Sequence, residues 1–246
     1  MHQRRPGSHI TVLTGAGIST GAGIPDFRGP EGTWTRHPDQ AELLEIDRYA
    51  SDPAIRQAGW RMWREHPAWS ATPSVAHRAL VELERAELLE ALLTQNFDGL
   101  HQAAGHSREQ VVELHGGLRT TSCLRCGARQ ATTAVLERLD RDREPACLEC
   151  GGILKPDVVY FGERLPEEAL GRAIAAAQDA DVFLAIGSTL SVQPVASLTG
   201  IAAESGAEVI IVNAEPTPYD HVAHRVIREP IEVAVPELVS ELLARG

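Results

Sequence analysis

The chain has 246 residues, of which 43% are hydrophobic, and its formal net charge is -11 from 23 basic and 34 acidic residues. This length suits one large α/β domain, alone or with a smaller one. The acidic balance argues against general nucleic-acid binding, because phosphate contacts require clustered Lys and Arg. It is compatible with a basic protein partner.

No apolar run predicts a membrane span. The longest runs, such as residues 209–212, are far shorter than the ~20 residues that a spanning helix needs. Arg4 and Arg5 precede the apolar residues 10–13, which superficially resembles a secretory signal, but that run stops at the glycine-rich segment from Gly15. We therefore expect a cytoplasmic protein that does not associate with membranes.

Short apolar, β-branched runs alternate with segments of helical apolar spacing along most of the chain. Strands are expected at 9–14, within 88–94, and at 111–114, 155–161, 182–186 and 209–212; helices are expected within 40–71 and at 76–86, 194–205 and 236–243. This alternation predicts an α/β fold with a Rossmann-like, doubly wound parallel sheet.

The composition changes between Cys123 and Cys150, where the chain becomes polar and rich in arginine. Such a segment buries little apolar area, so a bound metal would supply stability that it otherwise lacks. We expect a Rossmann-like domain of residues 1–39, 76–122 and 151–246, a helical insertion at 40–75 and a small zinc-ribbon module at 123–150. The tryptophans of the insertion fit either a core or a partner surface.

The four cysteines form the pattern C-x2-C-x20-C-x2-C, which comprises Cys123, Cys126, Cys147 and Cys150. In a cytoplasmic chain disulfides are disfavoured, and two chelating pairs at this spacing are a strong zinc signal. Four thiolates complete a tetrahedron and leave no open position, so the zinc ion should be structural. A redox CxxC pair is the alternative, against which the presence of two pairs argues.

The segment 15–19, GAGIS, follows the first expected strand and precedes an expected helix. Glycines there let the backbone approach a pyrophosphate, whose oxygens can accept hydrogen bonds from the free N–H groups of a helix N-terminus. The third glycine of the dinucleotide fingerprint is missing, and no acidic residue stands at a second strand end about 20 residues further on. By itself the segment fits a tight strand-to-helix turn equally well.

Other polar segments also follow expected strands, where an open α/β sheet binds ligands. The segment 94–98, TQNFD, fits an Asx-rich turn as well as a site, and the segment 187–189, GST, also fits a helix cap. His115 can accept a proton near neutrality, because the ordinary pKa of histidine is about 6.5. Most histidines are surface or core residues, however, and the chain has ten.

Two further segments distinguish a ligand site from a simple turn, a helix cap or an ordinary histidine. Residues 21–29 read GAGIPDFRG and residues 113–116 read ELHG, just before the first CxxC pair. Together with GAGIS and TQNFD, these segments resemble the sirtuin family, and the similarity extends over nearly the whole chain, from about Ile10 to Leu243.

The resemblance implies an NAD-dependent protein lysine deacylase that releases nicotinamide and an O-acyl-ADP-ribose. His115 would be the base that takes a proton from a ribose hydroxyl, and Asn96 would position the nicotinamide ribose and a water. Phe27 would shield the reactive ribose carbon, next to a cofactor loop from Arg28 to about Trp34. The residues implied to bind NAD are Gly15, Ala16, Gly17, Ser19, Ile24, Asp26, Phe27, Arg28, Trp34, Gln95, Asn96, Asp98, Gly187, Ser188, Thr189, Asn213, Ala214, Glu215 and Ile231.

The resemblance also implies an acylated lysine peptide as substrate, added as a strand and recognised mainly through its backbone. The residues implied to touch it are Val159, Phe161, Gly162 and Val192. Relatives that prefer succinyl or malonyl lysine carry a Tyr-x-x-Arg pair, which falls here at Arg61 and Arg64. Arg61 replaces the Tyr; its guanidinium suits an acyl carboxylate or simply a solvated helix face. Deacetylation is the leading expectation, and removal of acidic acyl groups stays open.

Two other functions share parts of this pattern. Protein mono-ADP-ribosylation uses the same cleaved glycosidic bond, but only deacylation needs His115 as a base for the ribose hydroxyl. A non-catalytic NAD-sensing module has no need of Asn96, Asp98 and His115 together. A dehydrogenase is disfavoured, because a regular GxGxxG is missing and no second catalytic domain is expected.

Overall fold

The computed structural model describes residues 9–30 and 32–245. The basic pair Arg4 and Arg5, and Glu31 of the expected cofactor loop, lie outside the described residues. No helix within the described ranges is long and apolar enough to cross a membrane.

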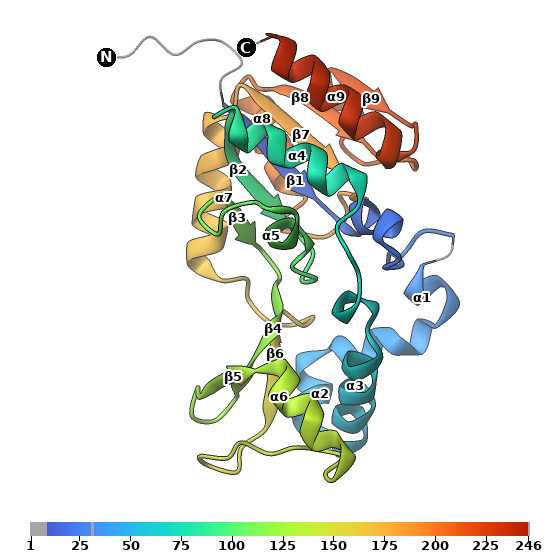
Figure 1. Cartoon of the computed structure of the whole chain (residues 1–246), viewed down its shortest axis with the longest axis vertical. Coiled ribbons are helices and arrows are strands. Elements are labelled where there is room, and N and C mark those ends of the chain that lie inside the picture. Colours follow the sequence, from blue (N-terminus) through green and yellow to red (C-terminus); the bar gives the residue numbers. More distant parts are fainter. Residues whose placement is uncertain (1–8, 31, 246) are drawn as a thin grey trace.

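A parallel sheet of six strands forms the larger lobe, in the upper part of Figure 1. Its order is β3-β2-β1-β7-β8-β9. The strands are β1 (Ile10–Thr14), β2 (Leu89–Thr94), β3 (Val111–Glu113), β7 (Val182–Ile186), β8 (Glu208–Val212) and β9 (Arg225–Ile227). The chain winds outward from β1 to one edge and, later, from β7 to the other, so the strand order reverses between β1 and β7. The predicted Rossmann-like doubly wound sheet is confirmed.

Helices cover both faces of this sheet, because alternate strand residues point to opposite sides. Val12 and Leu184 face a layer made by α4 (Val75–Arg85) and α9 (Ile231–Arg245). Leu13 and Phe183 face the other layer, made by α7 (Glu167–Asp179) and α8 (Ser197–Glu204). The buried strands are apolar on both faces, as expected for parallel strands between two helix layers.

Several element bounds differ from the expectation. The segment 16–22 after the first strand is a 3-10 helix, η1 (Ala16–Ala22). The strand expected at 155–161 is β6 (Leu154–Val158), which lies in a second sheet. The final helix begins at Ile231 and contains Pro236. Pro236 is the sixth residue of this helix, beyond the first turn where proline is favoured, so it cannot make the intrahelical hydrogen bond that this position normally forms.

The smaller lobe contains an antiparallel sheet, β5-β4-β6, and the helical insertion, in the lower part of Figure 1. Its strands are β4 (Gly116–Cys123), β5 (Arg129–Ala131) and β6. The remaining helices of the chain are α1 (Thr33–Arg36), η2 (Pro38–Leu44), α2 (Ile46–Ser51), α3 (Pro53–Glu65), η3 (Pro67–Trp69), α5 (Leu100–Ala104), α6 (Thr132–Leu136), η4 (Glu137–Asp140) and η5 (Asp220–Val222). β4 begins before residue 123 and β6 lies after residue 150, so the antiparallel sheet extends beyond the expected module of residues 123–150. The expected domain boundaries stay a prediction.

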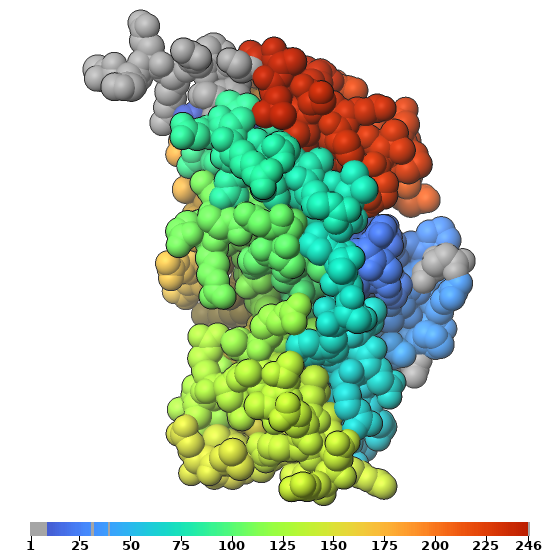
Figure 2. Space-filling view, in the orientation of Figure 1, coloured from blue at the N-terminus to red at the C-terminus, as the bar shows by residue number. Residues whose placement is uncertain are grey.

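The insertion and the cysteine-bearing segment share one apolar core. Trp60 and Trp63 of α3 are each 1% exposed and belong to the same cluster as Leu118 and Val135. The indole N–H of Trp63 donates to the hydroxyl of Tyr160 at 2.8 Å. Figure 2 shows the two segments, cyan and yellow-green, packed together in the lower part of the molecule. The tryptophans are therefore core residues of the smaller lobe.

Candidate functional site

The loops after β1 and β7 touch where the strand order reverses. The N–H of Gly17 donates to the carbonyl of Gly187 at 2.9 Å. A Cβ on Gly17 would lie 2.8 Å from the Cα of Gly187, and Gly187 itself has φ +63°. Both positions therefore require glycine. The crevice at such a reversal is the usual ligand site of a doubly wound sheet.

A cavity of about 720 Å³ opens at this point and reaches the segment after β6. Most of the predicted cofactor, catalytic and peptide residues line it: Ala16, Gly17, Asp26, Phe27, Arg28, Trp34, Gln95, Asn96, His115, Val159, Phe161, Gly162, Gly187, Ser188, Thr189, Val192, Asn213, Ala214, Glu215 and Ile231. Residues distant in sequence are thus brought to one cavity, although their individual roles stay predictions.

A second cavity of about 470 Å³ lies next to the first and shares Ala16, Phe27, Trp34 and Asn96 with it. Its lining includes residues of the helical insertion. Four further predicted residues also line it: Ser19, Ile24, Asp98 and Arg61. Two predicted residues line neither cavity, Gly15 and Arg64. Arg64 is exposed and its guanidinium lies 3.5 Å from the carboxylate of Asp140.

A buried polar network joins the first two motifs. The side-chain amide of Asn96 donates to the carbonyl of Gly15 and to the hydroxyl of Ser19, both at 3.1 Å. That hydroxyl donates to Asp98 at 2.7 Å. Burial raises the pKa of Asp98, against the lowering effect of hydrogen bonds from Leu100 and Ser19. With its amide N–H groups engaged, Asn96 keeps its carbonyl oxygen as an acceptor for a ligand.

His115 is held as a neutral base. Its Nδ1 lies 3.0 Å from the backbone carbonyl of Gln95, which can only accept, so Nδ1 carries the proton and Nε2 is free to take another. Burial lowers the pKa of His115 below 6.5, although the bond to Gln95 opposes this. The carbonyl of His115 accepts from the N–H of Val159 at 2.9 Å, which links the base to the predicted peptide segment.

Aromatic rings close one side of the cavities. The rings of Phe27 and Trp34 lie 4.6 Å apart, and Trp34 lies 5.5 Å from Phe161. The Arg28 guanidinium lies over the Trp34 ring at 4.7 Å, and burial lowers the pKa of Arg28. The loop backbone is fixed by Asp26, whose side chain accepts from the N–H of Gly29 at 2.9 Å. This arrangement provides an apolar wall with a cation beside it.

Other lining residues were not predicted. Some flank known motifs and could have been found by extending them, such as Thr20, Phe97 and Gln193. At the α9 end, Glu229, Pro230 and Glu232 surround the predicted Ile231. Leu44, from η2, and Leu165, between β6 and α7, have no local signal, because only the packing of distant segments brings them to the cavity.

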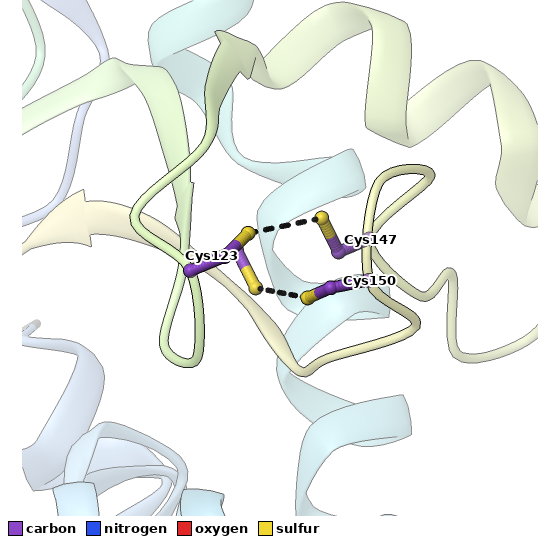
Figure 3. Close-up of side chains that lie close together, drawn as sticks. Cys123, Cys147 and Cys150 are labelled. Atoms are coloured by element: carbon purple, nitrogen blue, oxygen red, sulfur yellow. Dashed lines mark hydrogen bonds between the residues drawn. The ribbon is translucent and has the colours of Figure 1, made fainter.

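The four cysteines converge on one point (Figure 3). Their sulfur atoms all lie within 4.8 Å of one another, with Cys123 and Cys150 at 3.5 Å and Cys126 and Cys147 at 3.8 Å. Zn–S bonds of ~2.3 Å in a tetrahedron place sulfurs about 3.8 Å apart. The donor set and its spacing therefore fit one structural zinc ion.

Known proteins resemble this arrangement. A model of the Sir2 family matches residues 15–194. The chain is 48% identical over 234 residues to NAD-dependent protein deacetylase 2 of Streptomyces coelicolor. The aligned residues cover 95% of this chain and 97% of that protein. This chain belongs to the Sir2 family.

Further Sir2 relatives cover almost the same length. NAD-dependent protein deacylase 2 of Pyrobaculum aerophilum is 40% identical over 237 residues, covering 96% of this chain and 92% of the relative. A solved structure described as Sir2 with a p53 peptide and NAD+ superposes with a TM-score of 0.84 at 36% identity, covering 97% of this chain and 93% of that one. The resemblance inferred from the motifs is thus confirmed.

Proposed function

We propose that this Sir2 protein is an NAD-dependent protein lysine deacylase. It removes the acyl group of an acylated lysine, consumes NAD, and releases nicotinamide and an O-acyl-ADP-ribose. The observation that supports this best is the position of His115, which keeps Nε2 as an acceptor and lines a cavity together with the predicted NAD residues and the predicted peptide segment. Relatives that share 40–48% of their residues with this chain are named as deacetylases and deacylases.

NAD fits the cavities as an elongated substrate. The loops after β1 and β7 line the cavity with Ala16, Gly187 and Ser188 and are assigned to the two phosphates, and the segment 213–215 is assigned to the adenosine. Ser19, Ile24 and Asp98 around the second cavity suit the nicotinamide amide. A volume of about 720 Å³ is within the usual range of cofactor sites.

The chemistry assigned to the chain is proton transfer and orientation. Bound NAD supplies an activated glycosidic bond. Asn96, held by Gly15 and Ser19, orients the ribose and a water. His115 accepts a proton at Nε2 from a ribose hydroxyl, and Gln95 stabilises the resulting imidazolium through its carbonyl. Phe27 keeps the departing nicotinamide from returning.

The peptide is proposed to add as a strand between the segment 159–162 and the loop that contains Val192. Main-chain pairing provides affinity in such binding and predicts modest sequence specificity. Phe161 is 43% exposed at the cavity, while its backbone N–H is bonded to Leu44 at 2.7 Å. The side chain is thus presented on a fixed backbone.

Acetyl-lysine is the proposed substrate. Arg61 lies at the second cavity and could meet an acyl carboxylate, whereas Arg64 is engaged with Asp140 outside both cavities. Only one guanidinium therefore serves an acidic acyl group, so desuccinylation is expected to be secondary. We place the protein in the cytoplasm, because four thiols at metal-binding spacing suit a reducing compartment.

The test is NAD-dependent deacylation of acetyl- and succinyl-lysine peptides, followed by mass spectrometry for wild type and His115→Ala. We expect an O-acyl-ADP-ribose product from wild type and a loss of about 10²–10⁴-fold in the variant, the usual contribution of a general base. If wild type removes neither group yet transfers ADP-ribose to protein, the proposal is wrong and mono-ADP-ribosylation takes its place.

A further inference from the structure

An ion pair between a buried lysine and a half-buried glutamate joins the two ends of the segment 155–163. The Nζ of Lys155 lies 3.0 Å from the carboxylate of Glu163, and the two side chains are 8% and 24% exposed. Lysine is almost never buried this deeply unless it is paired. Burial lowers the pKa of Lys155, and Glu163 opposes that shift.

The pair fixes the backbone that lies between its members. Lys155 Nζ donates to the carbonyl of Val158 at 2.6 Å and to that of Pro156 at 3.0 Å. Glu163 accepts from the backbone N–H of Tyr160 at 2.7 Å. The ammonium also lies 4.4 Å from the centre of the Tyr160 ring. Two charges thus hold three backbone groups of one short segment.

The same segment is bonded to the site on its other side. Val159 donates to the carbonyl of His115 at 2.9 Å, and Phe161 donates to Leu44 at 2.7 Å. Restraints on Val158 and Tyr160 from the ion pair therefore determine where the intervening Val159 and the adjacent Phe161 lie relative to the base. Glu163 itself lines the larger cavity.

We propose that Lys155 and Glu163 are positioning residues for the peptide substrate. Their ion pair holds the end of β6 and the following residues 159–161 in the conformation that receives the peptide and in register with His115. This inference rests on the proposed deacylase function. Neither side chain takes part in bond making or breaking.

An exposed ion pair in the same region provides a matched control. Arg129 on β5 pairs with Asp157 at 2.7 Å, and the two side chains are 66% and 20% exposed, so the cation of this pair is in solvent, unlike Lys155. Asp157 also accepts from the hydroxyl of Thr120, a bond that remains when Arg129 is removed. Removing an exposed charge costs little, because water replaces the partner. Removing one member of a buried pair leaves the other charge without compensation, so the local backbone must rearrange.

The experiment compares Lys155→Met, Glu163→Gln, the double variant and Lys155→Arg with Arg129→Ala. Peptide KM and kcat are measured at saturating NAD, the Kd of NAD by calorimetry, and backbone hydrogen exchange over 156–163 by mass spectrometry. We expect each single neutral variant to raise peptide KM about tenfold or more and to accelerate exchange of this segment, with the Kd of NAD within roughly twofold of wild type.

Lys155→Arg, which keeps the charge, should recover most of the peptide affinity, and Arg129→Ala should behave like wild type. The double variant should be no worse than the worse single one, because no unpaired charge remains. Unchanged peptide KM or unchanged exchange in Glu163→Gln would overturn the inference, and so would a parallel weakening of NAD binding, which indicates a general structural role. Failure of wild type to deacylate any peptide refutes the proposed function instead.

Discussion

The two lobes are held together by different means. In the larger lobe, each face of a six-stranded sheet meets a layer of helices, and the buried apolar residues are almost all aliphatic. The smaller lobe has a three-stranded sheet and a core rich in aromatic rings, to which two cysteines also contribute. Its parts are further joined by an ion pair between the buried Arg56 of α3 and the half-buried Glu144. The comparison indicates that the larger lobe depends on apolar burial. The smaller lobe depends in addition on contacts between the helical insertion and the cysteine-bearing segment.

Loss of zinc should produce the largest difference in stability between the two lobes. Cys147→Ser removes one of four ligands from the cluster, and structural zinc contributes on the order of 10 kcal/mol to folding of small modules. We expect zinc content to fall from one per chain to near zero and deacylation to be lost, while circular dichroism retains the signal of the parallel-sheet lobe. Metal analysis and melting curves test this, with chelator-treated wild type as control; a zinc-free variant with normal activity would contradict it.

Truncation of the smaller core should have the next largest effect. Trp63→Ala leaves a cavity and also removes the hydrogen bond to Tyr160, so we expect a loss of about 3–5 kcal/mol in the free energy of unfolding. Leu92→Ala, in the larger core, should cost about 2–5 kcal/mol. Denaturant titration with separate probes for each lobe should show Trp63→Ala unfolding the smaller lobe first. Coincident transitions for both variants would mean that the lobes form one cooperative unit.

Acid should weaken both lobes alike. Burial lowers the pKa of His77, in α4, and of His66, beside η3, from 6.5 to about 4. Between pH 6.5 and about 4, each of these histidines is protonated in the unfolded chain and neutral in the folded chain. Their contribution to the free energy of unfolding is therefore complete above pH 6.5 and is lost as the pH falls towards 4. For the fully buried His77 the loss is about 3 kcal/mol. Melting temperatures from pH 7 to 4.5 measure it, and His77→Gln should flatten the dependence; an unaltered slope in that variant would assign it to other groups.

The smallest predicted effect is on the pH profile of the reaction. Burial lowers the pKa of His115 below 6.5, so Nε2 stays unprotonated at neutral pH and is lost as a base when the pH falls through that lowered pKa. We expect kcat/KM to be constant near pH 7 and to decline on the acid side, approaching about tenfold per pH unit. Initial rates over this range test it, with stability monitored in parallel. A decline that begins above pH 7 would indicate a raised pKa and exclude this environment for the base.

Strands with continuous apolar runs could be predicted well from sequence. Residues 182–186 and 209–212 differ from β7 and β8 by at most one residue, because short apolar runs rich in β-branched residues favour strands that are buried on both faces. The short apolar β3 was also found, but strands that are polar or partly exposed were not: β9 has a partly exposed pattern, and β4 is rich in Thr and Gly. The strand near 155–161 was recognised, but its partners were not, since β-propensity does not specify the neighbouring strand.

Motif spacing by itself determined the family, the two chelating cysteine pairs and the positions that need glycine. These depend on local geometry: two thiols three residues apart chelate one metal, and Gly15 and Gly187 each stand directly after a strand end. Only the tertiary structure decided which of these segments meet, that Arg61 lines a cavity while Arg64 pairs with Asp140, and that Lys155 and Glu163 form an ion pair. The reason is physical, because contacts between distant residues follow from which apolar faces pack together, and no local pattern encodes that choice.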